Sequence, residues 1–260
     1  MNRGITSFQF KIIGIILMVF DHIHQMFYFA GVPNWFTMLG RPVATMFILL
    51  SVEGVVHTRN IYSYMKRLLI AFWLMCAASL VIQKLLPSDV ILLNSILGTL
   101  FLCVLLMVST EKIVTGVKDR DKKALCLGVA GVLTFIMLQI VSFLLMIAGG
   151  SGVLSYLWFF VPSLFSVEGS ILIFMSIPLY LFRKHRMVQC LVIMVFSLLL
   201  TGFDFNNLYT TNIQWMMVFS IIPLLLYNGQ IGRKTRYFFY IFYPAHIYIL
   251  YIMSYMLASR

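Results

Sequence analysis

The chain has 260 residues, of which 62% are hydrophobic and only 10% are charged. Soluble domains carry about 45–50% apolar and about 25% charged residues, so this composition excludes a soluble globular enzyme, a disordered tail and a disulfide-stapled secreted module. Nineteen Lys and Arg against eight Asp and Glu give a net charge of +11, which in a soluble protein would indicate nucleic acid binding. Because the basic residues here lie in short clusters between apolar runs, we expect a membrane protein with no nucleic acid partner.

The four cysteines lie inside or at the edges of apolar runs, without the spacing typical of metal or redox sites: Cys76, Cys103, Cys126 and Cys190. We interpret them as small buried hydrophobes and expect no metal. The N-terminal region resembles a secretory signal, because Arg3 and Lys11 precede an apolar stretch. Asp21 and His22 then follow without a cleavage site, so we interpret the region as an uncleaved first span.

Apolar stretches approaching the roughly 20 residues that cross a bilayer recur along the whole chain. The predicted spans are, in chain order, 9–30, 37–57, 66–86, 90–110, 124–148, 167–183, 187–203, 213–228 and 236–257. Segment 150–165 is apolar but short and is broken by glycines and Pro162, which indicates a re-entrant or interfacial segment. The expected fold is therefore all-α, a polytopic integral membrane helix bundle of about nine transmembrane helices plus this segment, in a single domain over 1–260.

The basic residues are distributed unevenly among the span boundaries. Sixteen of them fall on every second boundary, in five clusters: Arg3 and Lys11; Arg59, Lys66 and Arg67; Lys112, Lys118, Arg120, Lys122 and Lys123; Arg183, Lys184 and Arg186; Arg233, Lys234 and Arg236. The other boundaries hold Lys84 and Arg260 alone, and Arg41 lies inside the second span. This bias predicts a cytoplasmic N-terminus and, with an odd number of spans, an external C-terminus.

Ionisable residues inside the spans are informative, because a charge at the bilayer centre costs about 2.5–3.5 kcal/mol on insertion scales. In the first span, His22 stands about ten residues, or about 15 Å, from the inner boundary. Its neighbour Asp21 does not share its helix face, so we expect Asp21 to reach His24, Gln25 or a cation on another span. These polar side chains either form a functional site or simply satisfy one another.

In the second span, Arg41 lies near the outer end. The turn at Pro33-Asn34-Trp35 is short, so the first two spans are predicted to be antiparallel neighbours, with Asp21 and Arg41 paired at similar depth. Such an arginine either completes a structural ion pair or holds an oxyanion or carboxylate.

The inner end of the second span carries Glu53, His57, Arg59 and Asn60. These residues indicate either a cytoplasmic mouth for an anionic phosphate ligand or a solvated loop with snorkelling cations.

The last span is interrupted by Tyr243, Pro244 and His246. Pro244 removes a backbone hydrogen bond and is expected to kink the helix. His246 matches His22 in predicted depth, and two neutral imidazoles near the midplane suit proton transfer. The alternative is an imidazole bonded to a carbonyl that the kink sets free.

Three blocks of sequence together resemble the TraX family of membrane proteins. They are FKIIGIILMVFDHIHQMF, LGRPVATMFILLSVEGVVHTRNIYSYMKRLL and LLLYNGQIGRKTRYFFYIFYPAHIYIL. The founding member of that family is associated with N-terminal acetylation of a conjugative pilin. The family is distantly similar to acyltransferase family 3. Members of that family place a His in the first span and an Arg in the second, ahead of a short stretch. Phe47–Ser51 resembles that stretch but lacks its glycine. Around Val167-Glu168-Gly169 the likeness is looser.

The resemblance implies a bacterial inner-membrane acetyltransferase that moves an acetyl group from cytoplasmic acetyl-CoA to an acceptor at the outer face. By resemblance the acceptor is the N-terminal amine of an exported pilin-like protein or peptide, and whether the enzyme serves conjugation is left open. The chemistry then needs a base, a stabiliser for the oxyanion and a site for the donor. The expected catalytic residues are His22, Asp21, Arg41 and His246, and the expected donor-binding residues are Glu53, His57, Arg59, Asn60, Arg67, Asn228, Arg233, Lys234, Arg236 and Tyr243.

Three other functions stay open at the level of sequence. The first is an O-acyltransferase that modifies a cell-surface glycan or a lipid-linked polymer. The second is a transporter, although no internal repeat of the kind common in transporters is evident. The third is a structural subunit of a conjugation or secretion apparatus, for which buried histidines would have no task. The acyl chain length and the oligomeric state are likewise open.

Overall fold

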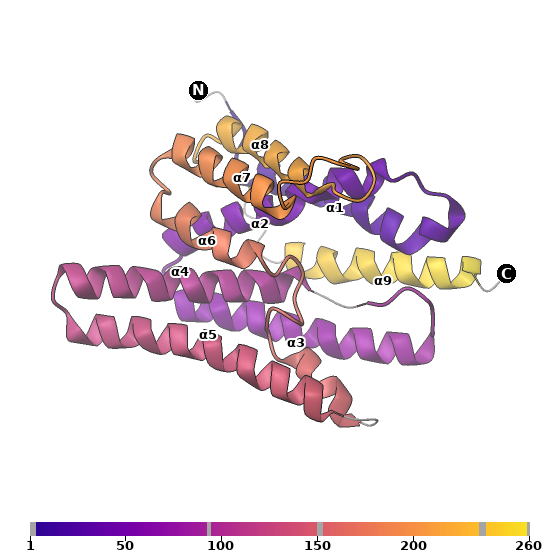
Figure 1. Cartoon of the computed structure of the whole chain (residues 1–260), viewed down its shortest axis with the longest axis horizontal. Coiled ribbons are helices and arrows are strands. Elements are labelled where there is room, and N and C mark those ends of the chain that lie inside the picture. The colour runs from indigo at the N-terminus through magenta and orange to yellow at the C-terminus, as the bar shows by residue number, and fades with distance from the viewer. Residues whose placement is uncertain (1–3, 93–94, 150–152, 234–237, 259–260) are drawn as a thin grey trace. The chain divides into compact units, whose positions relative to one another are not determined.

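A computed structural model describes residues 4–92, 95–149, 153–233 and 238–258 (Figure 1). Over these residues the regular elements are helices, apart from an isolated bridge between Ile5 and Tyr227. The long helices are α1 (Ser7–Phe27), α2 (Trp35–His57), α3 (Ile61–Leu85), α4 (Ile96–Lys118), α5 (Lys122–Ala148) and α9 (Phe238–Ala258). The shorter ones are η1 (Tyr28–Ala30), η2 (Val153–Phe160), α6 (Leu172–Leu181), α7 (Arg186–Leu200), η3 (Gln214–Ser220) and α8 (Ile221–Leu226).

Six helices in the described part of the chain are long and apolar enough to cross a membrane: α1 with η1, α2, α3, α4, α5 and α9. The prediction of an all-helical membrane bundle is thus confirmed for these residues, while the count of nine spans is not. The other three predicted spans correspond to shorter apolar helices: α6, α7 and the pair η3–α8. Helix α4 begins at Ile96 instead of residue 90, because Ser95 caps it by accepting a hydrogen bond from the amide of Leu97.

The chain divides into two compact units, which are described separately. The first unit comprises Met1–Leu50, Ile82–Ile91 and Lys184–Arg260, and the second comprises Ser51–Val81 and Leu92–Arg183.

In the first unit, α1 and α9 pack side by side and run in the same direction, since His22 meets His246 and Met26 meets Ser254 further along both helices. Helix α2 runs antiparallel to α1. Gly40 lies so close to Asp21 that a Cβ atom there would collide with the carboxylate side chain. Glycine therefore permits the close approach of the two backbones at the depth of Asp21.

The start of α1 is fixed at the other end of the first unit. Thr6 and Gln9 form a capping box: Thr6 Oγ1 accepts from the backbone N–H of Gln9, and Gln9 Oε1 accepts from the backbone N–H of Thr6. The chain at the start of α1 bonds to the segment after α8. The amide of Asn228 donates to the carbonyl of Ile5 at 3.0 Å, and the amide of Ser7 donates to the carbonyl of Gln230 at 2.7 Å. Helix α7 pairs with η3 and α8, and Arg186 donates to the carbonyls of Leu224 and Tyr227.

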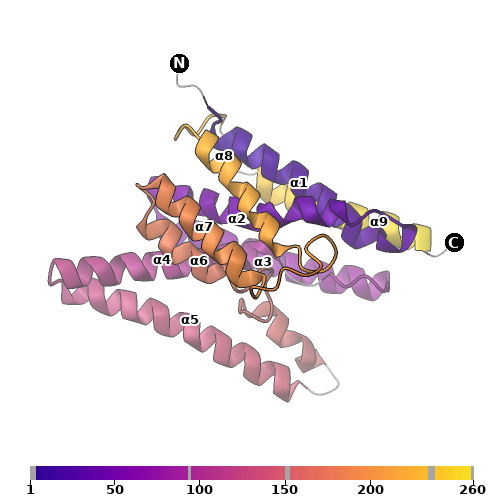
Figure 2. The ribbon, with the colours of Figure 1, turned by 45° about the horizontal axis from the view of Figure 1, so that its top comes forward.

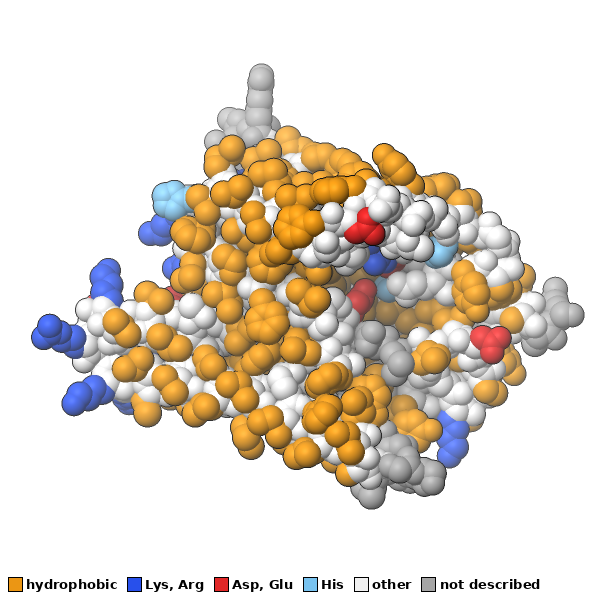
Figure 3. Space-filling model, in the orientation of Figure 1, with side chains coloured by type: hydrophobic (Ala, Val, Ile, Leu, Met, Phe, Trp, Pro, Cys, Tyr) orange, Lys and Arg blue, Asp and Glu red, His pale blue; other side chains and the backbone are white. Residues whose placement is uncertain are grey.

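In the second unit, α4 is the most deeply buried helix and packs against α5 and α6 (Figures 1 and 2). Asp121 caps α5 by accepting hydrogen bonds from the amides of Lys123 and Ala124, which fixes the tight turn from α4. Exposed basic side chains gather at this turn, whereas most of the face seen in Figure 3 is hydrophobic. Because of these clustered charges, we expect this end of the α4–α5 hairpin to lie in water.

The chain after α5 follows an interrupted path back along that helix. Helix η2 packs against α5; Leu164 then donates its amide hydrogen to Gln139 Oε1 at 2.7 Å, and the ring of Phe174 in α6 meets Phe135. The described part of the predicted segment 150–165 therefore packs against α5, whereas α6, within the predicted span 167–183, packs mainly against α4. Residues 150–152 of that segment lie outside the described part of the chain.

Candidate functional site

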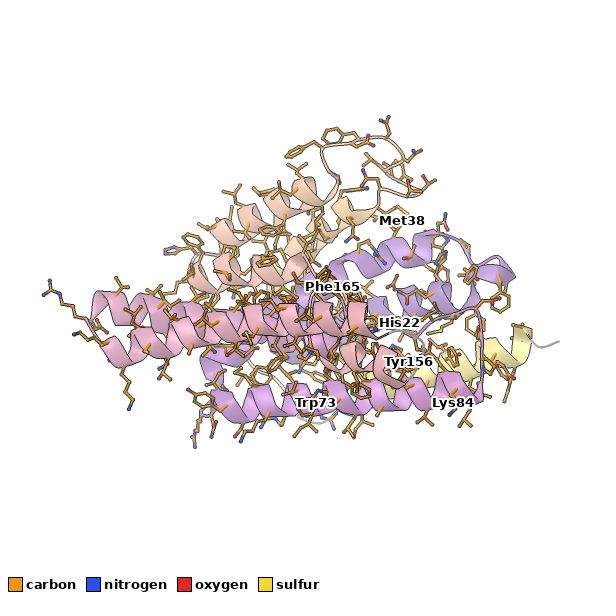
Figure 4. The ribbon with its side chains drawn as sticks, turned by 60° about the horizontal axis from the view of Figure 1, so that its bottom comes forward. His22, Met38, Trp73, Lys84, Tyr156 and Phe165 are labelled. Atoms are coloured by element: carbon orange, nitrogen blue, oxygen red, sulfur yellow. The ribbon has the colours of Figure 1, made fainter. Side chains whose placement is uncertain are left out.

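The two histidines that the sequence places at equal depth are in direct contact. His22 of α1 (labelled in Figure 4) and His246 of α9 are 6% and 8% exposed, and His22 Nδ1 lies 2.7 Å from His246 Nε2. His246 Nδ1 lies 2.9 Å from the carbonyl oxygen of Phe242, whose ring stacks on the His246 imidazole. Tyr243 is buried beside both imidazoles. The two histidines of the predicted site are thus neighbours in the first unit.

The carbonyl oxygen of Phe242 ends this series of hydrogen bonds, and it assigns the tautomers of both histidines. A carbonyl only accepts, so His246 Nδ1 carries a hydrogen, and in neutral His246 the Nε2 atom is then the acceptor. His22 Nδ1 must therefore be the donor across the 2.7 Å contact. This leaves the lone pair of neutral His22 on Nε2, the atom from which a general base acts.

The proline kink does not explain the position of His246. Pro244 lacks the N–H that would bond to the carbonyl of Tyr240, four residues earlier, whereas His246 bonds to Phe242. The imidazole of His246 therefore bonds to the carbonyl of Phe242 and not to that of Tyr240. It also bonds to His22.

Asp21 and Arg41 form the predicted ion pair, with Arg41 Nη2 3.0 Å from Asp21 Oδ1. Thr37 Oγ1 donates to the same oxygen at 2.7 Å, and Gln25 Nε2 donates to Oδ2 at 3.0 Å. These partners use both carboxylate oxygens, and no described contact joins Asp21 to His22. Asp21 therefore holds Arg41 rather than orienting His22.

Two members of this cluster were not found by sequence reasoning. Thr37 lies four residues before Arg41 on the same helix, and its carbonyl and hydroxyl accept from Arg41 Nε and Nη2 at 3.1 and 2.9 Å. That spacing alone could have indicated the contact. Gln214 of η3 accepts from Arg41 Nη1 at 3.2 Å, across 173 positions of sequence, and no local pattern points to it. His24 lies apart from the cluster and meets Asn34 at 3.1 Å.

The expected donor-binding residues fall into both units. Glu53, His57, Arg59, Asn60 and Arg67 belong to the second unit. His57 Nδ1 lies 2.9 Å from the carbonyl of Glu53 and 3.5 Å from its carboxylate. Asn60, just before α3, accepts through Oδ1 from the amide of Ser63 in the first turn of that helix. Arg67 lies over the Tyr64 ring at 6.0 Å, and its Nε is buried without a hydrogen-bond partner in the described structure.

The rest of the expected donor-binding set belongs to the first unit. Asn228 Nδ2 donates to the carbonyl of Gly4 at 3.3 Å, so this side chain ties the chain before α1 to the segment after α8. Arg233 follows α8, and Tyr243 lies beside His22. Lys234 and Arg236 lie outside the described residues. Asn60 and Asn228 thus have structural contacts, and donor binding by the whole set stays a prediction.

Within the described residues, no group of three or more His, Cys, Asp or Glu side chains is arranged to hold a metal ion. His22 and His246 are hydrogen-bonded to each other, which commits the two facing nitrogens to a shared proton. The arrangement suits proton transfer at His22 and anion stabilisation at Arg41.

Comparison with known proteins gives one match. The family model described as TraX protein matches residues 7–254, nearly the whole chain. No curated protein and no solved structure matches the chain. Since the match extends from the start of α1 into the last turns of α9 and so contains both histidines, the ion pair and Gln214, this chain belongs to the TraX family.

Proposed function

We propose that this protein is an integral membrane acetyltransferase, which moves an acetyl group from cytoplasmic acetyl-CoA to the N-terminal amine of an exported pilin-like protein or peptide. The observation that carries the proposal is the hydrogen-bonded pair of His22 and His246, which leaves a basic nitrogen on a buried imidazole. Family membership supports the same reaction class, because the TraX family resembles pilin acetylases. A purely structural subunit would have no use for this pair.

The proposed reaction begins with the loss of one proton from the ammonium group of the acceptor to water, because only the free amine attacks a thioester. The amine then attacks the acetyl carbonyl, and His22 Nε2 takes its second proton. His22 can pass its Nδ1 hydrogen to His246 Nε2, and the resulting imidazolium still donates to the Phe242 carbonyl. When the intermediate collapses, the proton returns to the departing thiolate, so the products are the amide and CoA.

Arg41 is proposed to stabilise the oxyanion of the tetrahedral intermediate. Its side chain is 25% exposed, against 7% for that of Asp21, so Arg41 is the more accessible member of the pair. A donor that is held in place before the reaction stabilises developing charge without reorganisation. Asp21 acts through Arg41 and is a positioning residue in this scheme.

Donor and acceptor are proposed to enter from opposite faces of the bacterial inner membrane. The basic clusters favour a cytoplasmic N-terminus and an external C-terminus, and the parallel course of α1 and α9 in the first unit agrees with both helices crossing in the same sense. Basic side chains at the cytoplasmic face in this orientation, such as Arg59 and Arg67 of the second unit, are proposed to bind the phosphates of CoA.

The test is acetyl transfer in proteoliposomes that contain the purified protein, acetyl-CoA and a peptide with a free α-amine. We expect His22→Ala to lower turnover by about 10²–10⁴-fold, because a positioned general base contributes about that much. His24→Ala is the matched control, since His24 lies on the same helix and contacts Asn34 instead of the cluster, and it should retain turnover.

The readouts are free thiol from CoA and the mass of the peptide. Wild-type turnover by folded His22→Ala would remove this histidine from the mechanism. A peptide that acquires no acetyl group, while a hydroxyl-bearing glycan does, would replace the amine acceptor with a hydroxyl one. Uptake or export of a solute without acetylation would instead identify a transporter.

A further inference from the structure

The hydrogen bonds of Arg41 leave one donor unused. A guanidinium carries five N–H groups. Nε donates to the carbonyl of Thr37, Nη2 donates to Thr37 Oγ1 and to Asp21 Oδ1, and Nη1 donates once, to Gln214 Oε1. In the described structure the remaining hydrogen is therefore the second one on Nη1, the nitrogen that Gln214 holds.

Thr37 and Asp21 hold only one edge of the guanidinium. Their contacts reach Nε and Nη2, whereas the opposite edge at Nη1 is held by Gln214 at 3.2 Å. An Arg–carboxylate pair can rotate and slide when only one edge is bonded, and displacement by about 1 Å is enough to lower a catalytic rate severely. The contact with Gln214 is therefore the one that fixes where the unused N–H points.

The chemical type of Gln214 fits this task. Asp21 already balances the charge of Arg41, so a second carboxylate would make the group net negative and weaken its attraction for an oxyanion. A neutral amide oxygen accepts the hydrogen bond without adding charge. The carboxamide also comes from η3, an element separate from α1 and α2, so it fixes the guanidinium from a third direction.

We propose that Gln214 is a positioning residue of the acetyl-transfer site, which holds the Nη1 edge of Arg41 so that its unused N–H faces the oxygen of the reacting acyl group. This inference rests on the proposed function. The segment before Gln214 is itself fixed, because Asn212 Nδ2 donates to the carbonyls of Thr201 at 3.1 Å and Asp204 at 2.6 Å. The loop between α7 and η3 thereby sets the position of a side chain in the site.

The experiment compares three variants by steady-state kinetics in proteoliposomes. Gln214→Leu removes the acceptor and should lower kcat roughly ten-fold, less than the 10²–10³-fold loss typical of deleting an oxyanion donor itself. Its KM for acetyl-CoA should stay within about two-fold of wild type, because the contact acts in the transition state. Gln214→Glu keeps an acceptor oxygen, so its kcat should recover as the pH falls and the new carboxyl becomes neutral.

Trp215→Phe is the matched control. It deletes the neighbouring hydrogen bond to Leu208, leaves Arg41 untouched and should keep wild-type kcat. An equal loss of kcat in Trp215→Phe and Gln214→Leu, or wild-type kcat in Gln214→Leu, would overturn the inference. A Gln214→Glu profile parallel to that of wild type at every pH would do so as well, because a merely structural role predicts no such recovery.

A second readout separates this inference from the proposed function. Phenylglyoxal modifies guanidinium groups, and the extent of modification at Arg41 can be followed by peptide mass without any turnover. Gln214→Leu should speed modification of Arg41 several-fold, and Trp215→Phe should not. Equal rates would refute the positioning role even if the acetylation proposal holds; faster labelling together with inactive wild-type protein would refute only the proposed reaction.

Discussion

At the scale of single residues, the contact between His22 and His246 carries most of the proposed chemistry. The Phe242 carbonyl assigns the hydrogen on His246, and His246 in turn assigns the hydrogen on His22. Neither assignment depends on Asp21, whose carboxylate is occupied by Thr37, Arg41 and Gln25. The site therefore contains a proton-transfer pair and a separate anion-binding group, each with its own positioning contacts.

Substitution of His246 tests that pair. We expect His246→Leu to lower single-turnover acetyl transfer about as much as His22→Ala, because both remove one unit of the same relay. The double variant should be no slower than either single one, since residues that act as a unit are non-additive. His246→Gln keeps an acceptor for His22 Nδ1 and should retain intermediate activity. Additive losses in the double variant would show that the two imidazoles act independently.

At the scale of elements, the interrupted path between η2 and α6 is the main departure from simple helices. Its non-helical backbone lies within a unit whose helices are apolar, where each unsatisfied N–H costs free energy. Side chains of the neighbouring helices bond to it: Gln139 of α5 accepts from the amide of Leu164, and Trp73 of α3 donates to the carbonyl of Phe160 at 2.9 Å. Polar side chains on α3 and α5 thus stabilise the break.

Gln139 provides a stability test of this arrangement. Gln139→Leu leaves the amide of Leu164 without its acceptor and should lower the free energy of unfolding by about 1–3 kcal/mol. Thr134→Val on the same helix is the control, because Thr134 is exposed and bonds only to the carbonyl of Ala130, so its loss should cost little. Thermal unfolding in detergent micelles measures both, and equal melting temperatures for Gln139→Leu and wild type would contradict the assigned role.

At the scale of the whole molecule, orientation follows from charge and not from any one contact. The α4–α5 turn is basic and exposed, whereas the loop between α7 and η3 carries Asp204 and exposed aromatic side chains such as Tyr209. Basic loops are retained on the cytoplasmic side during insertion. We therefore expect the α4–α5 turn to lie in the cytoplasm and the α7–η3 loop to lie outside.

Cysteine accessibility tests this orientation. Arg120→Cys and Tyr209→Cys are each introduced with Cys126→Ser, because Cys126 is exposed, whereas the other three native cysteines are buried. A membrane-impermeant maleimide should label Cys at position 209 in intact spheroplasts and at position 120 only after permeabilisation. The reverse pattern would invert the topology and place the donor-binding residues outside the cell.

The sequence by itself determined the features that depend on local composition. Apolar length predicted helices long enough to cross a membrane, and the scarcity of buried charges singled out Asp21, His22 and Arg41. The orientation expected from the basic clusters stays a prediction. The short turn between the first two spans was enough to predict the Asp21–Arg41 pair, because it forces those helices to be neighbours at matched depth. These properties depend on the free energy of each segment in a bilayer, and the local sequence of the segment determines that free energy.

Only the tertiary structure decided the contacts between distant segments. Equal depth did not require His22 and His246 to share a proton, and an ordinary glutamine after a loop gave no sign that Gln214 holds Arg41. No local pattern indicated that Gln139 of α5 would accept from the amide of Leu164 in the break between η2 and α6. Such contacts depend on which helix faces meet, and that choice is made by packing between elements far apart in sequence.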